Sequence, residues 1–294
     1  MREYFRKAEK ILKEWKGDSY TFGEDVLEAA GEYAQKCGKK AALIVTEFGQ
    51  AWIQKPLEQV KSSLKTNGII FETINGARPN APREDVYRIS LQVARSRSNV
   101  IVALGGGSTI DAAKAAAVLN TYSPAEVMEI LGASVSEADS IEPYFGTGLV
   151  SKMKETTGRA VVPVIGVQTA ASSGAHLTKY SNITDPVTGQ KKLIVDEAIV
   201  PPASVFDFKI TLDSPISLTL DGGLDGIAHA WEVFMGTSGP AYEKVKEVAE
   251  LSIRLIVYGL QKIKKDKRGL EGRTALGLGT DLGGRSESTR LNSS

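Results

Sequence analysis

Asn99-Val-Ile-Val-Ala-Leu-Gly-Gly-Gly-Ser-Thr-Ile-Asp-Ala-Ala-Lys114 is the stretch of this 294-residue chain that decides its fold class. Its first six residues form a short apolar run rich in β-branched side chains, which predicts a buried parallel strand. Three glycines follow the run directly, and residues 111–119 read as an alanine-rich helix. A strand that ends in glycines at the start of a helix is typical of sheets built from parallel strands with crossover helices.

The same alternation of strand and helix signals continues on both sides of this stretch. Asn80-Ala-Pro82 breaks the chain between two such units. Alternating strands and helices predict a doubly wound parallel sheet in the N-terminal part of the chain. The further strands are expected at 41–46, 68–73 and 161–167, and the further helices at about 52–64 and 84–94.

The pattern changes near residue 210, after which strand signals stop. Two long helical runs are expected at 217–234 and 242–263, and the second is apolar on much of its surface. The first residues of the chain also predict an amphipathic helix, with an apolar stripe that packs on the protein's own surface. The expected domains are an α/β domain at 1–208, an incomplete all-helical domain at 209–284 and a polar, disordered tail at 285–294.

Composition excludes several classes of protein. Lys and Arg number 36 against 35 for Asp and Glu, which gives no electrostatic case for nucleic acid or for an anionic membrane. The single cysteine, Cys37, excludes an internal disulfide and fits a cytoplasmic protein. No apolar run approaches the roughly 20 residues of a transmembrane helix, and the N-terminus is not a secretory signal.

The glycine turn at 105–107 predicts a site for a phosphate or pyrophosphate. Glycines let the backbone approach a ligand closely, and the N–H groups at the start of the next helix carry the positive end of its dipole. The turn is neither the dinucleotide fingerprint, because Ile110 stands at its sixth position, nor a P-loop, because no Gly-Lys-Ser/Thr follows. The alternative is a tight turn between strand and helix that binds nothing.

Asp225 and His229 lie four residues apart in the helical run at 217–234, within Gly222-Gly-Leu-Asp-Gly-Ile-Ala-His-Ala-Trp-Glu232. This spacing places both side chains on one helix face, where a carboxylate and an imidazole suit a divalent metal. Glu232 lies close to the same face and is expected to orient a ligand. The alternative for the pair is a salt bridge or a capped turn on the helix surface.

Four motifs in order make the chain resemble the iron-containing, group III alcohol dehydrogenase family, from about Tyr20 to Gly284. The resemblance implies an N-terminal dinucleotide-binding domain and an all-helical C-terminal domain. The motifs are Val45-Thr46-Glu47, the Gly-Gly-Gly-Ser-x-x-Asp-x-x-Lys run at 105–114, the Pro-to-Thr segment at 163–169 that leads to Ile183-Thr-Asp185, and Asp-x-x-x-His-Ala-x-Glu at 225–232.

The resemblance also assigns roles in cofactor binding, residue by residue. Glu47 is expected at the adenosine ribose, where an acid favours NAD(H) over NADP(H) because it repels a 2′-phosphate; the alternative is a solvated loop acid. The basic residue near the cofactor is expected to be Lys191, with Lys192 as the alternative. The pyrophosphate contacts are expected from Gly106, Gly107 and Ser108, and further cofactor contacts from Asp111, Thr169 and Thr178.

The departures from the family's pattern concern the metal. The family's site uses one Asp and three His, and the resemblance carries over only Asp225 and His229, for Fe(II) or Zn(II). The other two ligands are expected after the Gly-Leu-Gly-Thr-Asp-Leu-Gly-Gly stretch at 277–284, where the polar tail stands instead. His176 replaces an acid of the family and is read as a packed or solvated loop histidine, with metal binding or proton transfer as the alternative.

The resemblance therefore implies an NAD(P)-dependent alcohol dehydrogenase that acts on a small alcohol or aldehyde, in a C-terminally truncated form whose metal site is half built. Two alternatives stay open: an inactive dinucleotide-binding remnant that is stable as an oligomer, and a relative of the glycerol or polyol dehydrogenases. The missing helices leave apolar faces at 217–234 and 242–263, so a homo-oligomer is expected. The sequence identifies neither the alcohol nor the metal.

Overall fold

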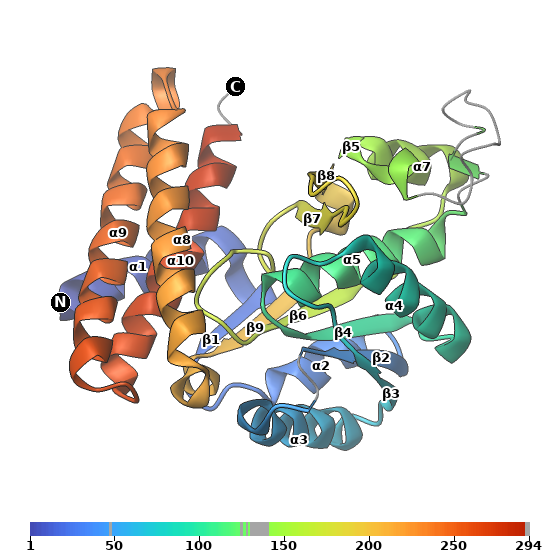
Figure 1. The fold of residues 1–294 in the computed structure, drawn as a ribbon, viewed down its shortest axis with the longest axis horizontal. Helices are drawn as coiled ribbons and strands as arrows, with labels where there is room; N and C mark the ends of the chain where they lie inside the picture. Colours follow the sequence, from blue (N-terminus) through green and yellow to red (C-terminus); the bar gives the residue numbers. More distant parts are fainter. Residues whose placement is uncertain (47–48, 124–125, 128, 130–140, 292–294) are drawn as a thin grey trace. The chain divides into compact units, whose positions relative to one another are not determined.

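A computed structural model of the protein describes residues 1–46, 49–123, 126, 127, 129 and 141–291 (Figure 1). Its main sheet has six strands in the order β1-β9-β6-β4-β2-β3, and the pairs β1–β9, β2–β3 and β2–β4 are parallel. The strands are β1 (Tyr20–Gly23), β2 (Lys40–Val45), β3 (Ile70–Asn75), β4 (Val100–Gly105), β6 (Val164–Gln168) and β9 (Ala203–Asp207).

The chain divides into two compact units. Unit 1 comprises the described residues of Met1–Leu27, Gln168–Thr178 and Ser204–Ser294, and unit 2 those of Glu28–Val167 and Lys179–Ala203. This division differs from the expected domains, because the first 27 residues and the 168–178 loop group with the C-terminal helices.

Unit 2 contains the alternating strands and helices that the sequence predicts. Strand β4 is buried along its whole length, as its apolar run requires. Because crossover connections are right-handed, α3 and α4 cover opposite faces of the strands (Figure 1). Helix α2 packs against α3, and α5 packs against α4. The helices are α2 (Ala29–Cys37), α3 (Ala51–Thr66), α4 (Arg83–Ser96), α5 (Gly107–Thr121) and α7 (Leu149–Thr157).

A small sheet in unit 2 was not predicted from the sequence. Its order is β5-β8-β7, with β7 (Tyr180–Thr184) antiparallel to β8 (Lys191–Val195) and β5 (Gly146–Thr147) parallel to β8. Strand β7 places Ser181 and Asn182 beside α5. Apolar alternation is weak in these short strands, and this explains why the sequence gives no clear signal for them.

Unit 1 is mainly helical, and from Phe208 onward its described residues form helices and no strand. Its core joins α1 (Arg2–Lys16) to α9 (Tyr242–Lys265) and α10 (Leu270–Leu291) through buried residues such as Leu12, Leu255 and Leu276. Helices α9 and α10 approach closely: a Cβ added at Gly279 would lie 3.0 Å from the carbonyl oxygen of Ser252. The glycines of the 277–284 stretch thus serve helix packing.

The polar segment 285–294 was expected to be a disordered tail, and for residues up to Leu291 this expectation is wrong. Helix α10 continues through these residues to Leu291. Packing against other parts of unit 1 stabilises this end of the helix. Ser286 is fully buried, and the guanidinium of Arg285 lies 5.8 Å from the Trp15 ring. Composition shows that this segment is polar, but it cannot show that Ser286 is buried by tertiary packing.

Helix α8 (Ile216–Met235) carries an exposed apolar stripe. Leu220, Leu224, Trp231 and Met235 are 42–63% exposed and recur at helical spacing along this helix. None of the described helices is long and apolar enough to cross a membrane. The exposure of these four side chains makes the stripe an apolar surface patch, of the kind that marks contact with other macromolecules.

Candidate functional site

The turn from β4 into α5 forms the first part of the candidate site, in unit 2. Gly106 is extended (φ −79°, ψ −173°) and caps α5, and its carbonyl accepts the N–H groups of Thr109 and Ile110, both at 3.1 Å. A Cβ added at Gly105 would lie 2.5 Å from the Thr109 Cβ, so the turn excludes any larger residue there. The first N–H groups of α5 lack helical acceptors and point out of the helix, toward any bound anion.

Asp111 follows one turn later and is buried. Its Oδ2 accepts a hydrogen bond from Asn182 at 3.3 Å, while Oδ1 has no hydrogen-bond partner among the described residues. Burial raises the pKa of Asp111 to about 6, against the charges of Lys114 and Lys191 and the hydrogen bonds from Asn182, which lower it. A buried acceptor with spare capacity fits a donor group of a ligand.

Two lysines compete for the expected basic position, and their contacts distinguish them. Lys192 forms an ion pair with Glu142. Lys191 is exposed at the start of β8, opposite Thr184, and lies close enough to Asp111 to lower its pKa. The structure thus brings Gly106, Gly107, Ser108, Asp111 and Lys191 into one unit.

The other expected cofactor residues are not among the described residues of unit 2. Thr169 and Thr178 belong to unit 1, where both are buried, and Thr178 packs near the α10 backbone at Gly284. Glu47 falls outside the described residues. Sequence reasoning missed Asn182, because its role depends on the unpredicted strand β7.

The candidate metal ligands lie on α8 in unit 1. Asp225 is exposed and has no described partner, and the Nε2 of His229 lies 3.7 Å from Glu287 Oε2 on α10. Glu287 was overlooked because the 285–294 segment was read as a tail. The described residues contain no group of three or more His, Cys, Asp or Glu side chains that could hold a metal ion. The donor set on the described residues therefore does not fit a retained divalent ion.

His176 lies in a different cluster of unit 1, fully buried beside Tyr20 and Asp281. Its Nε2 is 3.3 Å from the Tyr20 hydroxyl and 3.5 Å from Asp281 Oδ1, and Tyr20 donates a short hydrogen bond to Asp281 Oδ2. The reading of His176 as a packed histidine is thus confirmed. Burial raises the pKa of Asp281 to about 8, despite the hydrogen bond from Tyr20, which lowers it.

The raised pKa of Asp281 predicts a pH-dependent stability. Asp281 stays protonated in the folded protein up to about pH 8 and loses its proton near pH 4 in the unfolded chain. Its stabilising contribution is therefore complete below pH 4 and is lost as the pH rises toward 8, at up to about 1.4 kcal/mol per pH unit. Asp281→Asn replaces the titrating carboxyl group by an amide. The free energy of unfolding, measured in urea from pH 5 to 8, should therefore depend less steeply on pH in the variant. Parallel curves for the two proteins would contradict the assignment.

Comparison with known proteins identifies a family that this chain matches. The family model for iron-containing alcohol dehydrogenases matches residues 18–208. The 1,3-propanediol dehydrogenase of Klebsiella pneumoniae is 26% identical over 265 residues, covering 90% of this chain and 62% of that protein. The bifunctional aldehyde-alcohol dehydrogenase of Escherichia coli K12 is 29% identical over 255 residues, covering 83% of this chain and 27% of that protein.

Solved structures give the same fold. The alcohol dehydrogenase from Oenococcus oeni matches 93% of this chain and 65% of its own, with a TM-score of 0.75 and 25% identity. The NADH-dependent butanol dehydrogenase A from Thermotoga maritima matches 92% of this chain and 62% of its own, with a TM-score of 0.74 and 23% identity. The chain thus spans less than two thirds of the length of these relatives.

Proposed function

We propose, from the premise that the chain belongs to the iron-containing alcohol dehydrogenase family of oxidoreductases, that it binds NAD(H) for hydride transfer to and from a small alcohol or aldehyde. In the oxidative direction the alcohol loses a hydride to NAD⁺ and a proton to solvent, which leaves the aldehyde, NADH and H⁺. Relatives named for methanol and for 1,3-propanediol support a small alcohol as the proposed substrate class.

The observation that carries this proposal is the start of α5 together with Asp111. The N–H groups of Gly107 and Ser108 would bind the pyrophosphate, and the spare Oδ1 of Asp111 would accept a hydrogen bond from the nicotinamide half. Lys191 would offset the negative charge of the cofactor. The bound dinucleotide supplies the hydride acceptor, while these residues only bind and orient it.

The family also implies a metal, and here the described residues do not fit. Asp225 and His229 would be two of its ligands, and the further acid that the described residues bring near them is Glu287, 3.7 Å from His229. This incomplete set favours a second candidate function for the chain by itself: a dinucleotide-binding protein with little or no alcohol turnover. A third candidate is a relative of the glycerol or polyol dehydrogenases. The three candidates are distinguished by incubating the purified chain with NAD⁺ and a panel of alcohols and following the absorbance of NADH.

The first prediction tests dinucleotide binding. Gly106→Val places a branched side chain at the pyrophosphate turn, and we expect NADH to bind about 30-fold more weakly, or about 2 kcal/mol. Fluorescence titration measures the affinity, and Ser62→Val, at an exposed position of α3, is the control that adds the same side chain elsewhere. Equal affinity of the wild type and Gly106→Val would refute the assignment.

The second prediction concerns cofactor choice. We expect NADH to bind more tightly than NADPH, because the Glu47 carboxylate would repel a 2′-phosphate. Glu47→Gly should shift the ratio of the two dissociation constants toward NADPH by roughly tenfold. Glu47→Gln keeps the size of the side chain and should move the ratio in the same direction if charge is the cause. A wild type that already prefers NADPH would show that Glu47 does not select the cofactor.

The third prediction concerns the metal. Two aligned ligands let water compete for a divalent ion, so the dialysed chain should retain far less than one iron or zinc per chain. His229→Ala should leave this residual content unchanged, as measured by elemental analysis. A stoichiometric ion that His229→Ala releases would mean that ligands beyond Asp225 and Glu287 complete the site.

The fourth prediction concerns assembly. We propose that the exposed apolar stripe of α8 drives association of two or more copies of the chain. Light scattering at micromolar concentration should then show at least a dimer, and the double variant Leu224→Gln/Trp231→Gln should shift it toward monomer. Leu91→Gln, at an isolated exposed leucine of α4, is the matched control. A wild-type monomer would overturn this proposal.

A further inference from the structure

The loop after β3, residues 76–82, adopts a conformation that its own sequence does not favour. Asn80 (φ 65°) and Ala81 (φ 46°) are consecutive non-glycine residues with left-handed backbones. Asparagine tolerates this region, but at Ala81 it costs roughly 1 kcal/mol or more, so neighbouring contacts must hold the loop. Pro82 forms an isolated β-bridge with Thr184 of β7, and the N–H of Gly76 donates to the Val45 carbonyl oxygen of β2 at 2.7 Å.

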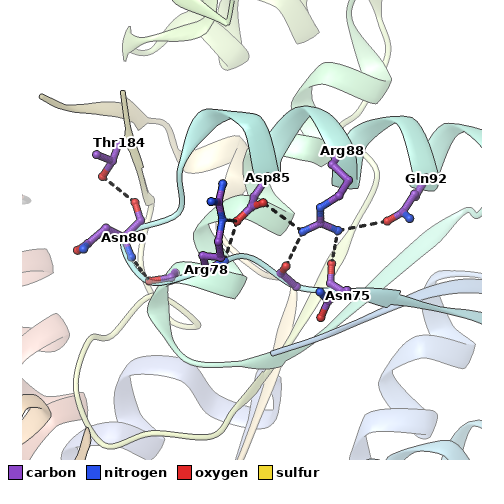
Figure 2. A network of polar contacts seen from close by, with 9 residues as sticks. Asn75, Arg78, Asn80, Asp85, Arg88, Gln92 and Thr184 are labelled. Carbon is purple, nitrogen blue, oxygen red and sulfur yellow. Dashed lines mark hydrogen bonds and ion pairs between the residues drawn. The ribbon is translucent and has the colours of Figure 1, made fainter. Parts of the chain in front are cut away.

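Arg88 of α4 holds the start of this loop (Figure 2). Its Nη1 donates to the carbonyl oxygen of Asn75 at 2.8 Å, and its Nη2 to that of Gly76 at 2.6 Å. One planar guanidinium thus binds two successive carbonyls at the end of β3, a geometry that a lysine cannot reproduce. Gln92 accepts a weaker contact from Nη1 at 3.4 Å.

Asp85, three residues earlier on α4, holds the middle of the loop. Its Oδ2 accepts the backbone N–H of Arg78 at 2.8 Å and the Nε of Arg78 at 3.0 Å, and its Oδ1 lies 3.5 Å from Arg88 Nη2. Burial acts to raise the pKa of Asp85, but the Arg78 hydrogen bonds and the two guanidinium charges lower it below its usual value. Asp85 is therefore an ionised link between Arg78 and Arg88.

The far end of the loop contacts the candidate dinucleotide site directly. The N–H of Asn80 donates to Ser108 Oγ at 3.0 Å, and Thr184 Oγ1 donates to the Asn80 carbonyl at 2.7 Å. Near the start of the loop, a Cβ added at Gly76 would lie 2.8 Å from Thr109 Oγ1. The loop thus packs on the first turn of α5 at both ends. Its Asn80 N–H binds the Ser108 hydroxyl oxygen, whereas the N–H groups of Gly107 and Ser108, which precede the first intrahelical bonds, are the ones that face a ligand.

We propose that Arg88 and Asp85 are positioning residues for the dinucleotide site: they fix the 76–82 loop, and through Asn80 they fix Ser108 at the start of α5. The inference rests on the proposed function. Neither residue is assigned a contact with the cofactor. A binding site that is already ordered loses less conformational entropy when the ligand binds. A substitution that loosens the 76–82 loop should therefore weaken binding without touching the ligand.

The test is NADH titration of Arg88→Gln against Arg95→Gln, an exposed arginine on the same helix with no described partner. Arg88→Gln should weaken NADH binding by about tenfold and Arg95→Gln by less than twofold, with thermal unfolding measured alongside. A double-mutant cycle with Ser108→Ala separates positioning from general destabilisation. If Arg88 acts through Asn80 and Ser108, the two effects are non-additive, whereas a general loss of stability adds.

The outcomes are distinguishable. A wild type that does not bind NADH overturns the proposed function and this inference with it. A wild type that binds, with Arg88→Gln equal to Arg95→Gln or additive with Ser108→Ala, overturns the inference alone. Should Arg88→Gln fail to fold, Thr184→Val removes the hydroxyl that holds the Asn80 carbonyl. It should weaken binding about threefold, and unchanged affinity in that variant also refutes the inference.

Discussion

Close backbone packing at the end of β4 is the constraint on which the candidate site depends. Gly105 and Gly76 both face Thr109 at distances that leave no room for a side chain. Helix α5 can therefore start directly where the strand ends, with its first N–H groups at the carboxyl edge of the parallel strands. Asp111, the β7 residues that contact it and the 76–82 loop all take their positions from this helix start.

Two buried carboxylates show how surroundings decide charge in this protein. Burial raises the pKa of both Asp111 and Asp281. Asp111 has Lys114, Lys191 and Asn182 to oppose burial, and its pKa of about 6 leaves it mostly ionised at pH 7. For Asp281 burial outweighs the hydrogen bond from the Tyr20 hydroxyl, and the pKa of about 8 leaves this acid mostly protonated at that pH. An ionised acid suits ligand binding in unit 2, and a neutral one suits the packed interior of unit 1.

The sequence predicts the elements that carry a strong period or a continuous apolar run. Strands β2, β3, β4 and β6 and helices α3, α4, α5, α8 and α9 lie close to their expected positions. Strands β1 and β9 were missed because each has only four or five residues and gains its place from a distant partner. Tertiary packing likewise decides that the polar end of α10 is helical.

The residues of the candidate site also differ in whether local sequence or tertiary structure determines their role. The glycine turn was predicted from local geometry, the strand-to-helix turn, and Asp111 was predicted from the family resemblance. Asn182 and Glu287 were missed because their partners lie 71 and 58 residues away in the chain. Arg88 and Asp85 carry no motif at all, and only the fold reveals that both reach the loop after β3.

The pairing of β1 with β9 sets an order on how the protein can be made. Tyr20 pairs with Ser204, so the second strand of unit 1 leaves the ribosome 184 residues after the first. Leu12 of α1 is buried in one cluster with Leu255 and Leu276, which leave the ribosome later still, so α1 reaches its final surroundings only after they have been made. Unit 2, whose residues lie mostly within one continuous stretch, can fold during that interval. The apolar stripe of α1 is thus exposed on the nascent chain until α9 and α10 have been made.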